Sequence, residues 1–179
     1  SLDFLPIQPF DLLALLQTNV KRILAYSSIS HLGYILVAFA ATAGMASPAA
    51  TYYIVAYMAT ALGAFGVISV LSTPEREAEE LADFHSLAWR RPGLAAVMCF
   101  MLLSLAGIPL TAGFIGKFYL VAAGANSSLW PMLVVLAVSS VIGLFYYLRV
   151  ILVMFAAEND ARMGAPGQML LNRRGITAG

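Results

Sequence analysis

The stretch LAGIPLTAGFIGKF, residues Leu105–Phe118, places a lysine inside an apolar run that is broken by three glycines and a proline. Residues 93–124 number 32, and Lys117 is the only charged residue among them. A straight helix of that length would reach about 48 Å, well beyond a hydrocarbon core of about 30 Å. We therefore predict two half-helices joined by irregular backbone, which is tolerated at membrane depth only inside protein or beside a wet cavity. Four residues are assigned to the broken helix: Gly107, Pro109, Gly113 and Gly116.

Lys117 has apolar sequence on both sides and would lie roughly 10 Å inside the membrane boundary if Gly124 marks the surface. One interpretation is a lysine that snorkels to the interface on its four-carbon stem. The other is a functional ionisable group, which is the default for such a residue within a membrane. Burial disfavours the charged ammonium and so favours proton exchange. The glycine-rich break favours this second interpretation.

The composition predicts an all-α membrane protein, because 61% of the residues are hydrophobic and only 11% are charged. A soluble domain has about 45–50% apolar and 25% charged residues. No basic tract indicates nucleic-acid binding. Cys99 is the single cysteine, so a disulfide or a cysteine metal site cannot form within the chain, and the acidic run in residues 75–80 has no partnering ligands for a metal.

The pattern predicts about four membrane spans within a membrane domain of residues 23–157. Residues 1–22 are expected to form an N-terminal stub and a cytoplasmic turn, and residues 158–179 a cytoplasmic loop or tail. The spans are residues 23–45, 50–71, 93–124 (broken) and 129–157.

The basic residues agree with this arrangement. Lys117 and Arg149 lie within spans, and eight of the ten Lys and Arg residues fall on one side of the membrane. By the positive-inside rule that side is cytoplasmic. It includes the loop of residues 72–91, and its basic residues are Lys21, Arg22, Arg76, Arg90, Arg91, Arg162, Arg173 and Arg174.

The first span has a polar face, because Ser27, His31 and Tyr34 follow one another at i, i+4 and i+7, with Tyr26 beside them. His31 could relay a proton, or it could be a neutral histidine that hydrogen-bonds across a helix contact. Lys21 at the start of this span could serve topology alone.

Two further groups of polar residues lie in the other spans. In the second span Tyr53, Tyr57 and Thr60 share a stripe for which packing is expected. Arg149 in the last span cannot practically deprotonate, so an electrostatic or structural role is expected. No acidic residue within the spans is available to pair with Arg149 or Lys117, so a partner from outside this chain is predicted.

Several long motifs show a family resemblance. The segment Gln17–Tyr34, QTNVKRILAYSSISHLGY, resembles the motif of the antiporter-like subunits of respiratory complex I. Ser104–Pro109 followed by Gly113–Phe118 resembles their broken twelfth helix. Gly63–Gly66 (GAFG) and Tyr146–Val150 (YYLRV) narrow the resemblance to the subunit N branch of proton-pumping NADH–quinone oxidoreductase. These motifs are far longer and more specific than a short regular expression.

The resemblance implies part of a fourteen-helix antiporter-like fold, built from two inverted five-helix repeats and flanking helices. It covers residues 12–157, the region of helices ten to thirteen with a stub of the ninth, so we expect a piece of a longer subunit or a truncated gene product. It also implies that Lys117 lies near the positive-side exit of a proton half-channel. His31 would then belong to the central polar axis, with Lys21 and Tyr26 nearby.

The function implied is that of a non-redox, proton-translocating subunit of an NADH:quinone oxidoreductase in the bacterial inner membrane. Its partners would be other complex I membrane subunits, the lipid bilayer and protons. Flavin, iron–sulfur clusters and quinone are expected on other subunits, and no cofactor or metal in this chain. Two alternatives stay open: a subunit of a multisubunit cation/proton antiporter, which sodium transport without NADH oxidation would favour, and a structural assembly subunit.

Overall fold

The computed structural model describes residues 7–41 and 46–156, and over these ranges it is helical with no strand. The expected all-α membrane fold is therefore confirmed. The predicted tail at residues 158–179 lies outside the described residues. In chain order the helices are α1 (Ile7–Leu16), α2 (Val20–Ala40), α3 (Ala46–Leu71), the 3₁₀ turn η1 (Leu81–Phe84), α4 (Leu87–Arg90), α5 (Pro92–Ala106), α6 (Ala112–Asn126) and α7 (Trp130–Phe155).

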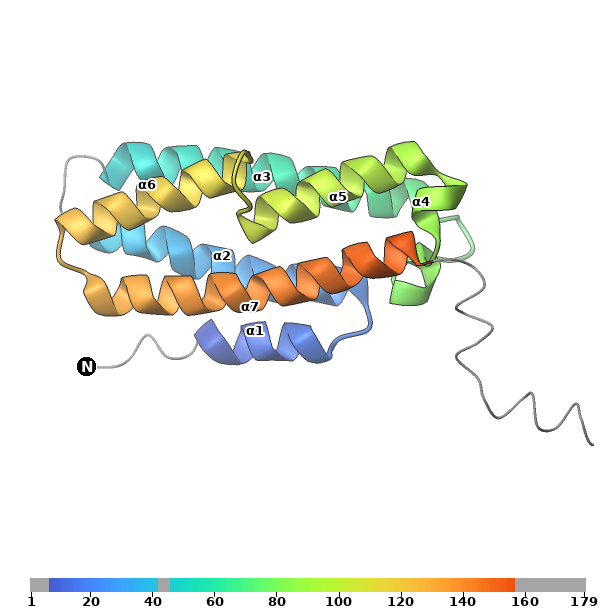
Figure 1. Ribbon diagram of the computed structural model, residues 1–179, viewed down its shortest axis with the longest axis horizontal. Coiled ribbons are helices and arrows are strands. Elements are labelled where there is room, and N and C mark those ends of the chain that lie inside the picture. The colour runs from blue at the N-terminus through green and yellow to red at the C-terminus, as the bar shows by residue number, and fades with distance from the viewer. Residues whose placement is uncertain (1–6, 42–45, 157–179) are drawn as a thin grey trace, which may run out of the picture.

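The long helices run side by side along one axis (Figure 1). α5 and α6 follow one another along α3 and both pack against it, so the two short helices together replace one long one. α2 lies between α3 and α7, and it contacts α6 as well. This arrangement brings the break between α5 and α6 to the middle of the bundle (Figure 1).

Three helices in the described part of the chain are long and apolar enough to cross a membrane: Val20–Ala40, Ser47–Leu71 and Trp130–Phe155. α5 and α6 have 15 residues each, about 22 Å apiece, so only the pair reaches across. The first span begins earlier than predicted, at Val20, because the side chain of Asn19 caps the helix by accepting a hydrogen bond from the Arg22 N–H at 3.0 Å. Lys21 is thus inside the first turn rather than before the span.

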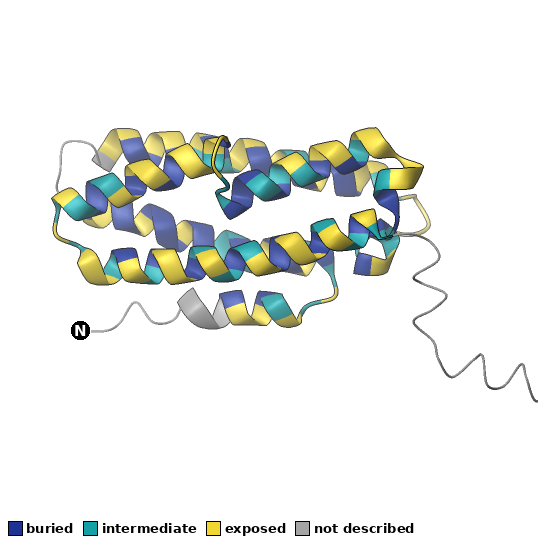
Figure 2. Cartoon of the chain, in the orientation of Figure 1, coloured by how far each residue is buried: buried dark blue, intermediate teal, exposed yellow. Residues whose placement is uncertain are grey.

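The outer faces of the bundle are exposed and the inner faces are buried (Figure 2), and many of the exposed side chains are large and apolar. Leu62 on α3 is 71% exposed, and Phe145 and Leu152 on α7 are 62% and 70% exposed. A soluble monomer rarely exposes large contiguous apolar surface. A lipid environment accounts for this surface, and the chain is an integral membrane protein.

The stub expected in residues 1–22 contains the ten-residue helix α1. At about 15 Å it is too short to cross the membrane. It nevertheless packs against both α2 and α7 (Figure 1). This packing places Asp11 in the interior of the bundle, fully buried.

The turn between α1 and α2 is joined to the loop of residues 72–91. The Val20 N–H donates to the Glu79 carbonyl at 2.7 Å, and the Leu81 N–H donates to the Thr18 carbonyl at 2.9 Å. Lys21 forms ion pairs with Glu77 and Glu79. A hydrogen bond shared with Glu77, together with those from Asn19 and Lys21, holds the pKa of the Glu79 carboxyl below its ordinary value. The turn that carries Lys21 and Arg22 and the loop of residues 72–91 therefore lie at the same end of the bundle, as predicted for these basic segments.

Candidate proton-transfer site

The broken helix forms where the sequence predicts it. α5 ends at Ala106 because Gly107 adopts φ +81°, a left-handed conformation that glycine adopts readily. Pro109 follows and has no N–H to continue the helix. Thr111 then caps α6 by accepting a hydrogen bond from the Phe114 N–H at 3.3 Å. The irregular backbone therefore lies between Ala106 and Ala112.

Lys117 lies in α6 and points back toward the end of α5. Its Nζ donates to the carbonyl oxygens of Leu105 at 3.1 Å and Ala106 at 3.0 Å, and to Ser140 Oγ of α7 at 2.9 Å. The side chain is only 8% exposed. Carbonyl groups at a helix C-terminus carry partial negative charge and stabilise a nearby cation. The break thus supplies the ligands that hold the ammonium in the interior.

Glycines permit the close approach on which this site depends. A Cβ at Gly107 would lie 2.9 Å from Lys117 Cδ, and one at Gly113 would lie 1.8 Å from the Ser104 carbonyl oxygen. A Cβ at Gly116 would lie 2.8 Å from the Tyr53 ring. Larger residues at these positions would separate α6 from α5 and α3.

His31 of α2 is buried between two tyrosine hydroxyls. Its Nδ1 lies 2.7 Å from the Tyr53 hydroxyl of α3, and its Nε2 lies 3.3 Å from the Tyr147 hydroxyl of α7. The Tyr57 ring stacks on the imidazole with 4.8 Å between centroids. Both ring nitrogens therefore have hydroxyl partners that can pass a proton in either tautomer.

Tyr34 lies between the two ionisable groups. Its ring centroid is 5.4 Å from that of His31 and 5.3 Å from Lys117 Nζ. A cation within about 6 Å of an aromatic centroid is attracted by the ring. Ser27 belongs to the same group of residues, because its hydroxyl is hydrogen-bonded to that of Tyr147.

The remaining predicted residues of α2 lie elsewhere. Tyr26 is partly buried and packs against the apolar core. Lys21 lies at the loop end of the helix, ten residues from His31, or about 15 Å along the axis. The structure therefore brings Ser27, His31 and Tyr34 to one site and leaves Lys21 outside it.

Asp11 is the residue that the sequence analysis missed. Its Oδ1 accepts hydrogen bonds from Ser30 of α2 and from the Tyr146 hydroxyl of α7 at 3.5 Å. Its Oδ2 and the neighbouring Ser139 Oγ are buried without a hydrogen-bond partner among the described residues. Asp11 is also within electrostatic range of Lys117. No acidic residue lies within the predicted spans, but the charge that was predicted to come from outside this chain is present in the bundle, because α1 folds back against α2 and α7.

Arg149 also has a partner within this chain, which corrects the second part of that prediction. Its Nη1 donates to the carbonyl oxygens of Leu15 at 2.9 Å and Gln17 at 3.2 Å, at the end of α1. The last carbonyls of a helix lack intrahelical partners. Arg149 therefore caps α1 and fixes the helix that carries Asp11.

The described residues contain no group of three or more His, Cys, Asp or Glu side chains that could hold a metal ion. What they do contain is a buried cluster of ionisable and hydroxyl side chains contributed by five helices, with a lysine at a broken helix. Fold and site together define a helical membrane protein with a polar axis in its interior.

Comparisons with known proteins agree with this class. The family model described as NADH:quinone oxidoreductase/Mrp antiporter, TM, matches residues 10–143. The chain belongs to this family.

Two curated relatives are both named NADH-quinone oxidoreductase subunit N. The protein of Ectopseudomonas mendocina is 55% identical over 159 residues, with 87% of this chain and 32% of the relative covered. That of Chromohalobacter salexigens is 50% identical over 159 residues, with 88% and 33% covered. The chain thus spans about a third of the length of these relatives.

Two solved structures are similar to this fold. A chain of respiratory complex I from Thermus thermophilus with bound aureothin superposes with a TM-score of 0.71 at 32% identity, with 86% of this chain and 35% of that chain covered. A chain of the membrane-bound sulfane sulfur reductase, an archaeal respiratory membrane complex, gives 0.77 at 27% identity, with 85% and 31% covered. The predicted resemblance to the antiporter-like subunits is confirmed.

Proposed function

We propose that this chain is part of a proton-translocating membrane subunit of an NADH–quinone oxidoreductase. The observation that carries the proposal is the buried cluster of Lys117, His31 and Asp11, in which the Tyr34 ring contacts both Lys117 and His31, while tyrosine and serine hydroxyls bond to His31 and Asp11. A charged residue within a membrane marks a proton or ion pathway by default. The names of the two curated relatives support the same function.

In the proposed mechanism Lys117 is the proton carrier and His31 the group that supplies it. Redox energy released in another subunit changes hydration and charge pairing along the polar axis. His31 receives a proton through Tyr53 or Tyr147, and Lys117 takes it up on the Tyr34 side and releases it toward the periplasmic side. Asp11 is the negative charge that stabilises the protonated lysine. Arg149 supports the site by holding α1.

The proposed orientation places Lys21, Arg22, the loop of residues 72–91 and the tail in the cytoplasm of a bacterium, with the bundle in the inner membrane. Positive residues favour the cytoplasmic side. In the structure the residues of that loop pair with the turn before α2. The flavin, iron–sulfur clusters and quinone site of the enzyme belong, in this proposal, to other subunits.

Further protein is proposed to cover the broken helix. Leu110, in the break, is 99% exposed and has φ +78°. Irregular backbone at membrane depth does not face lipid. We therefore place another part of the longer subunit, or a neighbouring membrane subunit, against this segment.

The hydroxyl of Tyr53 provides a first test of the relay. Tyr53→Phe removes the partner of His31 Nδ1 without changing the packing of the ring, and we expect roughly tenfold slower proton transfer, less than the hundredfold or more for loss of the proton-transfer group itself. The measurement is proton uptake into vesicles that contain the assembled complex, relative to NADH oxidised. Tyr52→Phe is the matched control, because Tyr52 is on the same helix, is 36% exposed and contacts the Tyr119 ring instead. Equal behaviour of the two variants would contradict the route through Tyr53 and leave Tyr147 as the group that supplies His31.

Asp11→Asn tests the charge that supports Lys117. The amide keeps the shape of the side chain but removes the negative charge, so we expect about tenfold slower proton transfer, equivalent to about 1.4 kcal/mol in the barrier, with normal assembly. Glu75→Gln, which neutralises an exposed loop carboxylate, should leave transfer unchanged. Normal pumping by Asp11→Asn would remove Asp11 from the mechanism.

A further inference from the structure

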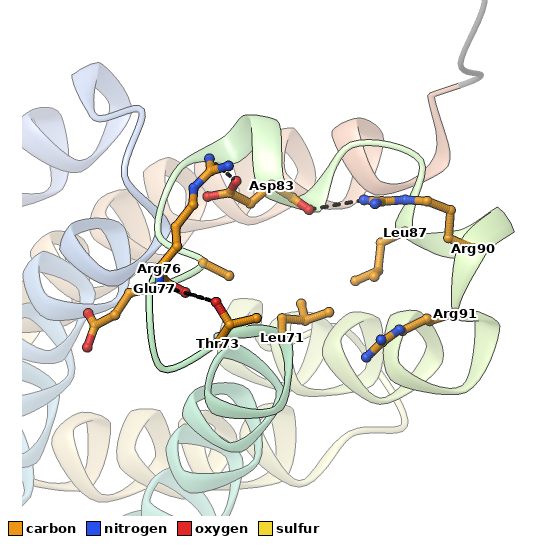
Figure 3. Close-up of a pocket in the computed structure, with 9 residues that line it drawn as sticks. Leu71, Thr73, Arg76, Glu77, Asp83, Leu87, Arg90 and Arg91 are labelled. Atoms are coloured by element: carbon orange, nitrogen blue, oxygen red, sulfur yellow. Dashed lines mark hydrogen bonds and ion pairs between the residues drawn. The ribbon is translucent and has the colours of Figure 1, made fainter.

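A pocket of about 340 Å³ lies at the loop end of the bundle (Figure 3), whereas the broken helix lies in the middle of the bundle (Figure 1). It is formed by the end of α3 and by the loop of residues 72–91, including α4 and Arg91, which precedes α5. Three arginines and two carboxylates line it: Arg76, Arg90, Arg91, Glu77 and Asp83. The rest of the wall is formed by Leu71, Thr73, Ala78 and Leu87.

Both carboxylates are already matched by a cation. Asp83 Oδ1 accepts from Arg76 Nη2 at 2.6 Å. Glu77 pairs with Lys21 outside the pocket, and its carboxylate points away from the cavity in Figure 3. The charge that remains in the pocket is therefore that of Arg90 and Arg91.

These two arginines are available to an anion. Two backbone carbonyls hold the Arg90 side chain in place: its Nη2 donates to the carbonyl oxygens of Asp83 at 3.2 Å and of His85 at 2.9 Å. A guanidinium has five N–H donors, so most of them stay free. The Arg91 side chain has no hydrogen-bond or ion-pair partner among the described residues, and it lines the pocket with Leu71 and Leu87 (Figure 3).

The position of the pocket favours a lipid. It lies where two membrane helices end, and the outer faces of these helices carry exposed apolar side chains, including Val70 of α3 and Val97 of α5. Trp89 is 72% exposed at the same level, which is where tryptophan anchors proteins at a membrane surface. Guanidinium pairs suit phosphate oxygens, and basic pockets of this kind at the cytoplasmic side receive anionic headgroups.

We propose that Arg90 and Arg91 bind the phosphate of an anionic phospholipid of the cytoplasmic leaflet, with the acyl chains against α3 and α5. The bound lipid would hold the loop of residues 72–91 against the membrane surface. This inference does not depend on the role of Lys117 in proton transfer.

The test is lipid binding by the full complex that contains this chain, reconstituted in nanodiscs of phosphatidylcholine with a small fraction of spin-labelled phosphatidylglycerol. Each of Arg90→Gln and Arg91→Gln should lower the affinity about tenfold, because each removes charge-assisted hydrogen bonds to the phosphate. Arg22→Gln is the matched control, because Arg22 is an exposed arginine at the same end but outside the pocket.

Three results would overturn the proposal. An equal loss for Arg22→Gln and Arg91→Gln would mean that the basic surface attracts anionic lipid without a site. Displacement of the labelled lipid by millimolar inorganic phosphate, with the same loss in the arginine variants, would mean that the pocket takes free phosphate instead. An unchanged affinity in the double variant Arg90→Gln, Arg91→Gln would exclude the pocket as a binding site for either the lipid phosphate or free phosphate.

Discussion

Replacement of Lys117 by alanine is expected to slow proton transfer by at least about a hundredfold, the lower range for losing a positioned proton-transfer group. NADH oxidation by the uncoupled complex should continue, because the side chain is proposed to act on protons alone. The measurement is the initial rate of vesicle acidification, divided by the rate of NADH oxidation in the same preparation.

The companion variant Lys117→Arg separates a carrier from a fixed charge. Arginine keeps the positive charge but does not release its proton in a protein. If Lys117 carries protons, Lys117→Arg should be as defective as the alanine variant. Normal acidification by Lys117→Arg would instead mean that the lysine acts through its charge, as a ligand of the Leu105 and Ala106 carbonyls.

The second large effect is structural. Gly113→Ala would place a Cβ 1.8 Å from the Ser104 carbonyl oxygen and 2.8 Å from its carbonyl carbon. Both atoms belong to backbone, so no side chain can rotate to relieve the contact, and α6 must move away from α5. We expect a loss of stability of about 3 kcal/mol, the upper part of the range for overpacked sites. The amount of assembled complex in membranes and its thermal inactivation temperature measure this loss.

Gly66→Ala in α3 is the control for that experiment. A Cβ at Gly66 has nothing within 4 Å, so the substitution should be neutral or slightly stabilising, since alanine favours a helix over glycine. Equal stability of the two alanine variants would contradict the close contact between α5 and α6. A defect confined to Gly113→Ala would support it.

The approximate helix positions and the break followed from the chain alone. Hydrophobic run length sets where a helix can cross the membrane, and the 93–124 run was too long for one straight helix. Gly107 and Pro109 each disrupt a helix locally, through a left-handed conformation and a missing N–H, so the break needed no tertiary information. His31, Ser27 and Tyr34 were grouped correctly because helical periodicity alone places them on one face.

The partners of these residues depended on the tertiary structure. Asp11 sits in a segment too short and too polar to be read as a span, and only the packing of α1 against α2 and α7 makes it an interior residue. Arg149 has carbonyl partners rather than a carboxylate, and such acceptors have no sequence signature.

The sequence placed Tyr53 on a helical stripe for which packing was expected. The spacing of such a stripe is the same whether the tyrosine hydroxyl faces lipid or the His31 imidazole, so it could not predict the hydrogen bond to His31. The sequence by itself therefore determined the membrane class, the broken helix and the intramembrane lysine, since these follow from hydrophobicity, backbone conformation and local spacing. Only the tertiary structure decided that Lys117, His31 and Asp11 form one cluster, because their side chains come from three different helices and their proximity depends on how those helices pack.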